Sequence, residues 1–304
     1  MSPAATQLAR VTAGINPQED ALRIAVTGAA GQLGRQVVEI LAAHEDHDVV
    51  AVSRRPVPYA AHFTHVSVAL ADYTDPPALR AALHGVHTLV FVSSDGEAVS
   101  VLRHHQNVIQ AAAASGVTHI VALSGLDADL SSPFCYAVTY GLTEQLLYDS
   151  GCQVSTARAS IFTEFFLQFL TPARTSGEVR LPAADGRISL VSRTDVGRCL
   201  AALAVGAPTG RHHDITGPEA LDLTTIAALA GQLWETPVEY VGLTPVGYRV
   251  ELARTGLEPW WCYAFSTMFD SVRQHRWARV SDELSRLTGH QPRSIRDLLT
   301  QAEW

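Results

Sequence analysis

Tyr136, in the segment FCYAVTYGLTEQL, is the side chain whose type and setting could most directly do chemistry. A phenol with an unperturbed pKa near ~10 stays protonated at neutral pH, so Tyr136 would be a poor base. It could still act as an acid or a hydrogen-bond donor towards a carbonyl or quinone that receives a hydride. The 304 residues contain no lysine that could lower the pKa of the tyrosine. Tyr136 therefore favours reduction over alcohol oxidation, and the open alternative is a tyrosine that only packs at a helix start.

A second chemical signal is the glycine-rich segment TGAAGQLG at residues 27–34. It directly follows an apolar run of strand length and opens a segment with helical periodicity, which is the setting of a dinucleotide-binding loop. The glycines would allow a tight turn, a close approach to a pyrophosphate and close packing of the helix on its sheet. The phosphates would lie over the N-terminal N–H groups of that helix. The cofactor contacts predicted for the loop are Gly28, Ala30, Gly31, Gln32, Leu33 and Gly34.

The residues after the second apolar run indicate which dinucleotide binds. A protein specific for NAD places an acidic residue about 20 positions beyond the glycines, where it binds the ribose hydroxyls. Arg54 and Arg55 stand there instead, and a guanidinium can bind a 2′-phosphate bidentately. We therefore expect NADP(H), the alternative being two arginines on a solvated strand end. Further contacts are expected at the carboxyl ends of the third and fourth strands, from Asp72, Ser93 and Ser94.

The glycine loop belongs to a chain in which strand-length apolar runs alternate with helical patterns. The expected strands are 22–28, 49–54, 65–70, 88–94, 119–125 and 153–160, and the expected helices are 32–44, 75–85, 99–116 and 136–150. Strands that are buried on both faces read as continuous hydrophobic runs, as these do. The alternation with short connections predicts an α/β fold of the Rossmann type, a doubly wound parallel sheet with helices on both faces.

The alternation breaks after residue 158. Segment 161–186 predicts a helix and an irregular excursion, 187–205 a return to the sheet followed by a helix, and 212–217 a last strand. The pattern is mostly helical from residue 218 onward. We assign 21–157 plus 188–217 to the NADP-binding domain, and 158–187 plus 218–304 to a smaller, mostly helical C-terminal lobe on the substrate side. Residues 1–20 are expected to form a flexible leader.

Composition and the absence of other motifs restrict the class of protein. Hydrophobic residues make up 47% of the chain and charged residues 17%, as in well-packed globular proteins. The net charge of −8 argues against a nucleic-acid surface. No apolar stretch reaches the ~20 residues of a membrane span, and the scattered cysteines read as reduced thiols, so we expect a cytoplasmic protein without membrane contact. The histidines form no zinc-binding spacing and no G-x-S-x-G elbow occurs, so neither a metal site nor a hydrolase is expected.

Five segments together resemble the motifs of one known family: TGAAGQLG, VSRRP, ADYTDPPALRAALHGV, AAAASGVTHIVALSG and ITGPEALDL. They resemble the NmrA-like group of atypical short-chain dehydrogenases/reductases, above all its quinone-oxidoreductase-like and triphenylmethane-reductase-like members. DGRISLVSRTDVGRCLAAL and LSRLTGHQPRSIRDLL are similar as well, so the likeness covers nearly all of residues 22–300. It implies a Rossmann domain with a small C-terminal lobe, NADP(H) in the cleft, and either reduction of a small conjugated acceptor or nucleotide sensing.

The sequence departs from the resembled pattern in two places. Short-chain dehydrogenases carry a Tyr-x-x-x-Lys pair whose lysine holds the nicotinamide ribose and lowers the tyrosine pKa, and here Tyr140 replaces the lysine. A family segment similar to T-E-N-F reads TEFF at 163–166, so Phe165 stands where the family has an asparagine. Ser124, at the end of the fifth strand, matches the position of a polar serine in the relatives. Tyr136 and Ser124 are therefore the catalytic candidates.

Substrate contacts are expected around the helix start at 135–136 and after the sixth strand. The candidates are Cys135, Tyr140, Phe162, Phe165 and Phe166. Tyr140 could equally pack inside the fold, and the aromatic group 260–269 is more typical of lobe core than of pocket. Arg158 could meet an anionic group of the substrate or pair with a buried carboxylate such as Glu164; the sequence does not decide.

The leading hypothesis is an NADPH-dependent reductase that transfers a hydride to a quinone-like or conjugated carbonyl compound, an apolar or aromatic small molecule. Such acceptors give delocalised products that need little acid assistance, so proximity and orientation can supply much of the rate. The alternatives are a non-catalytic NADP(H) sensor of the NmrA type and a non-redox isomerase or dehydratase. A homodimer is compatible with the sequence, which does not define the oligomeric state.

Overall fold

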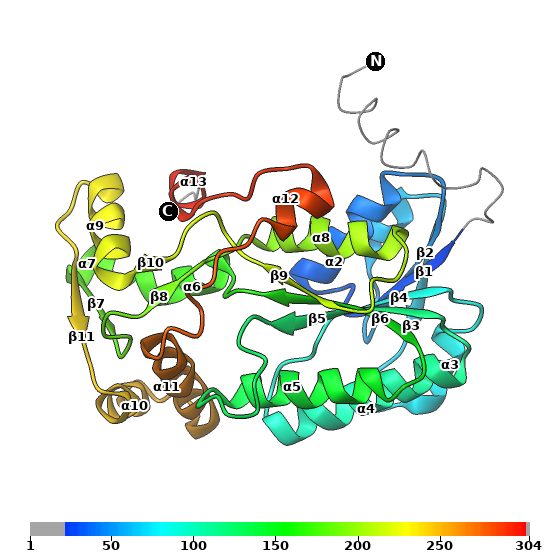
Figure 1. Cartoon of the computed structure of the whole chain (residues 1–304), viewed down its shortest axis with the longest axis horizontal. Helices are drawn as coiled ribbons and strands as arrows, with labels where there is room; N and C mark the ends of the chain where they lie inside the picture. Colours follow the sequence, from blue (N-terminus) through cyan, green and yellow to red (C-terminus); the bar gives the residue numbers. More distant parts are fainter. Residues whose placement is uncertain (1–21, 302–304) are drawn as a thin grey trace, which may run out of the picture.

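The computed structural model of the protein describes residues 22–301, and the predicted leader at 1–20 lies outside them. At its centre is a seven-stranded sheet with the order β3-β2-β1-β4-β5-β6-β9 (Figure 1). All six strand pairs in it are parallel. The strands are β1 (Arg23–Val26), β2 (Asp48–Ser53), β3 (Val66–Leu70), β4 (Thr88–Phe91), β5 (His119–Gly125), β6 (Gln153–Ala159) and β9 (His212–Ile215). The order reverses between β1 and β4, which is the point where doubly wound sheets bind dinucleotides.

Two layers of helices cover this sheet, which confirms the predicted fold class. α2 (Gln32–Ala42) and α8 (Arg193–Val205) lie on one face, and α3 (Pro76–Ala82), α4 (Ala98–Ala114) and α5 (Cys135–Tyr148) lie on the other (Figure 1). Val37 and Leu200 pack with β1 in the core of the first face. Leu79, Val108 and Leu147 pack with β4 in the core of the second. Burial on both faces explains the continuous apolar runs of the central strands.

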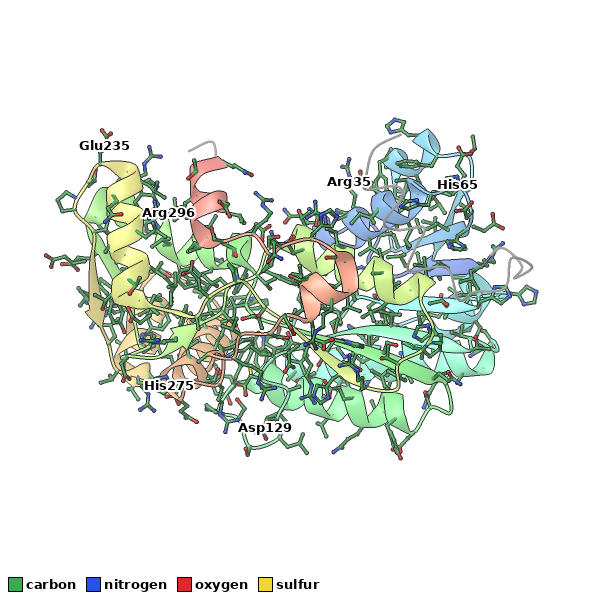
Figure 2. The ribbon with its side chains drawn as sticks, turned by 45° about the horizontal axis from the view of Figure 1, so that its top comes forward. Arg35, His65, Asp129, Glu235, His275 and Arg296 are labelled. Atoms are coloured by element: carbon green, nitrogen blue, oxygen red, sulfur yellow. The ribbon has the colours of Figure 1, made fainter. Side chains whose placement is uncertain are left out.

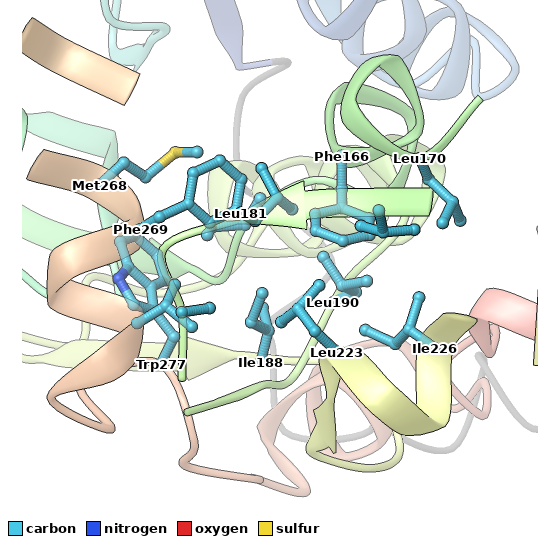
Figure 3. Packing of buried hydrophobic residues seen from close by; sticks show 14 of the residues in the cluster. Phe166, Leu170, Leu181, Ile188, Leu190, Leu223, Ile226, Met268, Phe269 and Trp277 are labelled. Atoms are coloured by element: carbon cyan, nitrogen blue, oxygen red, sulfur yellow. The ribbon is translucent and has the colours of Figure 1, made fainter. Parts of the chain in front are cut away.

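The other elements of the described chain gather mainly at one end of the molecule as a lobe (Figure 1). They are α6 (Thr163–Leu170), α7 (Ala173–Ser176), β7 (Glu178–Leu181), β8 (Arg187–Ile188), β10 (Leu221–Asp222), α9 (Leu223–Trp234), β11 (Glu239–Gly242), α10 (Pro245–Arg254), α11 (Pro259–Arg273) and α13 (Ile295–Gln301). Phe166, Leu181, Ile226 and Phe269 meet in the lobe core (Figure 3). The short η1 (Pro58–His62) follows β2, and α12 (Glu283–Thr288) packs on α8.

One element of the predicted topology is wrong. The chain does not return to the central sheet at residue 187, because β8 pairs antiparallel with β10 in a separate ladder. An isolated bridge joins Phe162, which follows β6, to Val191 a few residues beyond β8. The sequence also missed β7, β10 and β11, and strands of two to four residues between helices leave no recognisable apolar run. The last central strand, β9, lies where it was predicted.

Two glycines let α2 approach its neighbours at very different distances. A Cβ atom at Gly34 would lie 2.3 Å from the carbonyl oxygen of Gly28 and 3.0 Å from the amide nitrogen of Ala29. A Cβ atom at Gly197 of α8 would lie 3.6 Å from Cβ of Gln36, an ordinary contact. Position 34 therefore requires glycine, whereas position 197 has room for alanine.

We predict that Gly34→Ala lowers the free energy of unfolding by about 1–3 kcal/mol, because main-chain atoms must move to admit the methyl group. The matched variant Gly197→Ala should leave it unchanged or raise it by up to about 1 kcal/mol, because alanine is the better helix former. Urea denaturation of both variants and the parent measures the difference. Equal effects of the two substitutions would contradict the close approach at Gly34.

Candidate active site

The glycine loop joins β1 to α2 at the carboxyl edge of the sheet. Gly28 has a φ of +65°, and its carbonyl accepts the N–H of Gly31 at 2.8 Å, which closes the tight turn. Gly31 is the N-cap of α2 and no side chain caps that helix. The first N–H groups of a helix have no acceptor within it, so those of α2 are free to bind an anion. The predicted loop thus has the geometry that a dinucleotide diphosphate needs.

A tyrosine that the sequence analysis missed fixes this loop. The hydroxyl of Tyr59 in η1 donates to the carbonyl of Ala29 at 2.8 Å. Its ring lies 4.9 Å from the guanidinium of Arg35, which pairs with Glu39. Arg35 lies at the outer surface of the molecule (Figure 2). The pattern of residues gives no sign of this contact, because η1 is a single turn that interrupts the strand and helix rhythm.

Arg54 and Asp72 meet at the ends of β2 and β3. The Nε atom of Arg54 lies 3.9 Å from a carboxylate oxygen of Asp72, and 77% of the Arg54 side chain is exposed. Hydrogen bonds from the backbone and hydroxyl of Thr74 hold the pKa of Asp72 below its ordinary value. An exposed ion pair at this distance is weak. The Arg54 guanidinium is therefore available to a phosphate. Arg55 is the next residue and lies at the same edge of the sheet.

The loop after β4 carries Ser93 and Ser94 and is held by buried groups. Ser93 donates its hydroxyl to the carbonyl of Leu123 at 2.9 Å. The backbone N–H of Ser94 donates to Nε2 of His105 at 3.3 Å, while Nδ1 of His105 lies 2.8 Å from the hydroxyl of Thr143. Burial lowers the pKa of His105 to about 4. His105 is thus neutral, with its proton on Nδ1, and it ties the loop to α4 and α5.

Tyr136 lies at the start of α5 and is 9% exposed. Its hydroxyl donates to the carbonyl of Gly96 and accepts the Gly96 N–H at 3.0 Å, so it bridges to the same loop that His105 holds. Burial raises the pKa of Tyr136 above its ordinary value. The phenol therefore keeps its proton at neutral pH, as expected for a chain without lysine.

Ser124 belongs to a hydrogen-bond network separate from that of Tyr136. Its hydroxyl donates to Oε1 of Glu144 at 2.7 Å, and Nε of Arg158 donates to the same oxygen at 2.9 Å. The pairing with Glu144 holds the pKa of Arg158 above its ordinary value. This decides between the two roles open for Arg158: it pairs with a carboxylate, although with Glu144 and not with Glu164. No hydrogen bond joins Ser124 to Tyr136 in the described part of the chain.

Aromatic side chains surround Tyr136. Tyr140 stacks at 6.3 Å from Tyr136, and Trp260 of α11 meets the same ring edge-on at 6.1 Å. The ring of Tyr140 fills the space beside Gly125, where a Cβ atom would lie 2.5 Å from it. Burial raises the pKa of Cys135, so its thiol is not activated.

The three phenylalanines after β6 differ in accessibility. Phe166 is fully buried and presents no surface to a ligand. Phe165 and Phe162 are partly exposed, and Phe165 packs against Phe169 and Phe265. Only Phe162 and Phe165 are thus accessible as pocket walls.

Between residues 22 and 301, no group of metal-ligating side chains occurs and no helix is long and apolar enough to cross a membrane.

Comparison with known proteins identifies the family. Residues 28–205 match the family model described as NAD(P)H-binding. Quinone oxidoreductase 2 of Escherichia coli (strain K12) is 33% identical over 237 residues, which cover 77% of this chain and 82% of that protein. The (4-alkanoyl-5-oxo-2,5-dihydrofuran-3-yl)methyl phosphate reductase of Streptomyces griseus is 31% identical over 284 residues, 90% of this chain and 95% of the relative.

Solved structures agree with these matches. The crystal structure of the NADPH-dependent quinone oxidoreductase of Escherichia coli complexed with NADPH aligns with a TM-score of 0.85 and 31% identity, over 91% of this chain and 98% of the other. The triphenylmethane reductase of Citrobacter sp. aligns with a TM-score of 0.83 over 93% of this chain and 100% of the other, and its 23% identity shows the fold alone. With its glycine loop, parallel sheet and lobe, the chain belongs to the NmrA-like group of atypical short-chain dehydrogenases/reductases and is an NAD(P)H-dependent oxidoreductase.

Proposed function

We propose that the protein is an NADPH-dependent reductase that transfers a hydride to a quinone-like or otherwise conjugated carbonyl compound. The observation that carries the proposal is a buried tyrosine that stays protonated, beside aromatic side chains and without a lysine. Such a group can donate a hydrogen bond or a proton to an acceptor oxygen, and it is a poor base for alcohol oxidation.

The two relatives with at least 30% identity support this class of acceptor. One is named for quinones and the other for a substituted dihydrofuranone phosphate. In both compounds a carbonyl is conjugated with a carbon–carbon double bond, so hydride addition gives a delocalised anion. We propose a conjugated carbonyl as the acceptor of the present chain, without proposing either of these two compounds.

NADPH is proposed over NADH because of Arg54. Its exposed guanidinium stands at the end of β2, where an acidic residue would bind ribose hydroxyls and repel a 2′-phosphate. The remaining contacts proposed for the cofactor are the first turn of α2, Asp72 and the Ser93–Ser94 loop. Bound NADPH would supply the hydride.

We propose that the hydroxyl of Tyr136 donates to the acceptor oxygen. Ser124, at the end of β5, is proposed as a second polar group near that oxygen. The phenol proton would pass to the oxygen that gains charge and would be replaced from water. To do so, the Tyr136 hydroxyl must exchange its hydrogen bond to the Gly96 carbonyl for one to the acceptor. Tyr140, Cys135, Phe162 and Phe165 are the proposed apolar contacts that orient the acceptor and exclude water.

The first prediction concerns activity. Purified protein should oxidise NADPH when a panel of quinones and α,β-unsaturated ketones is added, because the cleft needs only a donor to assist hydride transfer. The measurement is loss of nicotinamide absorbance with each acceptor and with a saturated ketone as control. Tight NADP(H) binding without turnover by any acceptor would favour the sensor hypothesis, and product formation without NADPH oxidation would favour a non-redox enzyme.

The second prediction concerns Tyr136. Tyr136→Phe should lower kcat/KM for a quinone roughly 10- to 100-fold, because a positioned proton donor is lost. Since the pKa of Tyr136 is raised, the parent should keep a constant kcat/KM between about pH 6 and 9. Tyr148→Phe, a change at an exposed site on the same helix, is the matched control. Full activity of Tyr136→Phe would remove the tyrosine from the mechanism and leave the reductase proposal standing.

A further inference from the structure

Arg193 lies at the start of α8, and none of the cofactor motifs includes it. It is the first residue of α8, and its neighbour Thr194 lies 3.4 Å from the side-chain nitrogen of Gln36 on α2. A Cβ atom at Gly197 would touch Leu33 and Gln36, so α8 runs beside α2 from its first turn. The N-terminus of α8 therefore lies at the same sheet edge as the glycine loop.

The side chain of Arg193 is partly buried and forms no salt bridge within residues 22–301. Its guanidinium lies 5.7 Å from the centre of the Phe162 ring. Among the described residues, the guanidinium forms no salt bridge and donates no hydrogen bond, and the charge of Glu164 attracts it from beyond salt-bridge distance. Burial also lowers the pKa of Arg193 from its ordinary value. Burying an unpaired charge has a cost, and an anion from outside the chain would offset it.

The carboxylate of Glu164, which attracts the guanidinium, is already hydrogen-bonded to the backbone of Arg193. Both oxygens of Glu164 accept the backbone N–H of Arg193, at 3.1 and 3.0 Å. The hydroxyl of Ser192 accepts the N–H of Asp195 at 3.0 Å and caps α8. The N–H groups of Arg193 and Asp195 are thus satisfied, and the guanidinium is left to bind a ligand. Stacking on Phe162 orients it without neutralising it.

We propose that Arg193 binds the diphosphate of the dinucleotide from the α8 side, opposite the N–H groups of α2. A guanidinium can donate two parallel hydrogen bonds to phosphate oxygens, which suits this anion. The inference rests on cofactor binding by the family and is independent of the acceptor. It adds a second phosphate-binding arginine whose role differs from that of Arg54. Arg54 would recognise the 2′-phosphate that only NADPH carries, and Arg193 would recognise the diphosphate that NADPH and NADH share.

The two arginines can be separated with three probes. Calorimetry would measure the dissociation constants of NADPH, NADH and adenosine 2′-monophosphate, which has no diphosphate, for the parent, Arg193→Gln and Arg54→Gln. Arg193→Gln should weaken NADPH and NADH equally, by roughly 10- to 100-fold, as expected for the loss of a charged hydrogen-bond donor. It should leave adenosine 2′-monophosphate unchanged. Arg54→Gln should weaken NADPH and adenosine 2′-monophosphate and spare NADH.

A thermal melt of the ligand-free variants completes the experiment. Because the guanidinium of Arg193 is partly buried and forms no salt bridge in the described part of the chain, Arg193→Gln should keep or raise the Tm of the parent. Unchanged binding of both dinucleotides would overturn the proposal, including the case in which only the KM of the acceptor rises. Equal weakening of all three probes together with a lowered Tm would also overturn it, since Arg193 would then be structural. Arg193→Lys should recover part of the dinucleotide affinity, because it restores the charge without the fork of donors.

Discussion

The contact between Gly34 and the main chain of Gly28 is the constraint on which the site depends. It brings the first turn of α2 against the end of β1, at a distance that no side chain permits. The uncapped N–H groups of that turn then point to the carboxyl edge of the sheet, at the strand crossover between β1 and β4. α8 packs beside α2, where Gly197 lies against side chains of α2. This packing places Arg193 at the same edge of the sheet.

Buried polar groups position the loop after β4 and the residues at the end of β5. Neutral His105 fixes the loop after β4, and Tyr136 holds the next part of that loop through Gly96. Arg158 and Glu144 compensate each other and hold Ser124. These groups form their hydrogen bonds within the protein, because a buried polar group without a partner would raise the free energy of the folded state. The phenol of Tyr136 has a raised pKa and lies beside aromatic side chains, so in the proposed mechanism it suits reduction better than alcohol oxidation.

The middle strands β1, β2, β4 and β5 could be predicted because they are buried on both faces and each leaves an apolar run. The lobe could be predicted only as mostly helical, since its short strands β8 and β10 pair across more than thirty residues of sequence without any apolar pattern. Glycine spacing and Arg54 indicated the cofactor site, because those signals are local. The partners of Arg158 and His105 could not be predicted, because side chains on separate elements meet only once the helices pack. The position of Arg193 depends on the same packing of α8 beside α2.

The most direct test of the account follows the hydride itself. NADPH deuterated at the transferable position of the nicotinamide would be mixed with the protein and an α,β-unsaturated ketone, and the product would be analysed by mass spectrometry and NMR. The account predicts one deuterium on a carbon of the reduced product for each NADPH oxidised, with slower turnover than with ordinary NADPH when transfer limits the rate. A reduced product without deuterium, or bound NADPH that stays reduced with every conjugated acceptor, would contradict it.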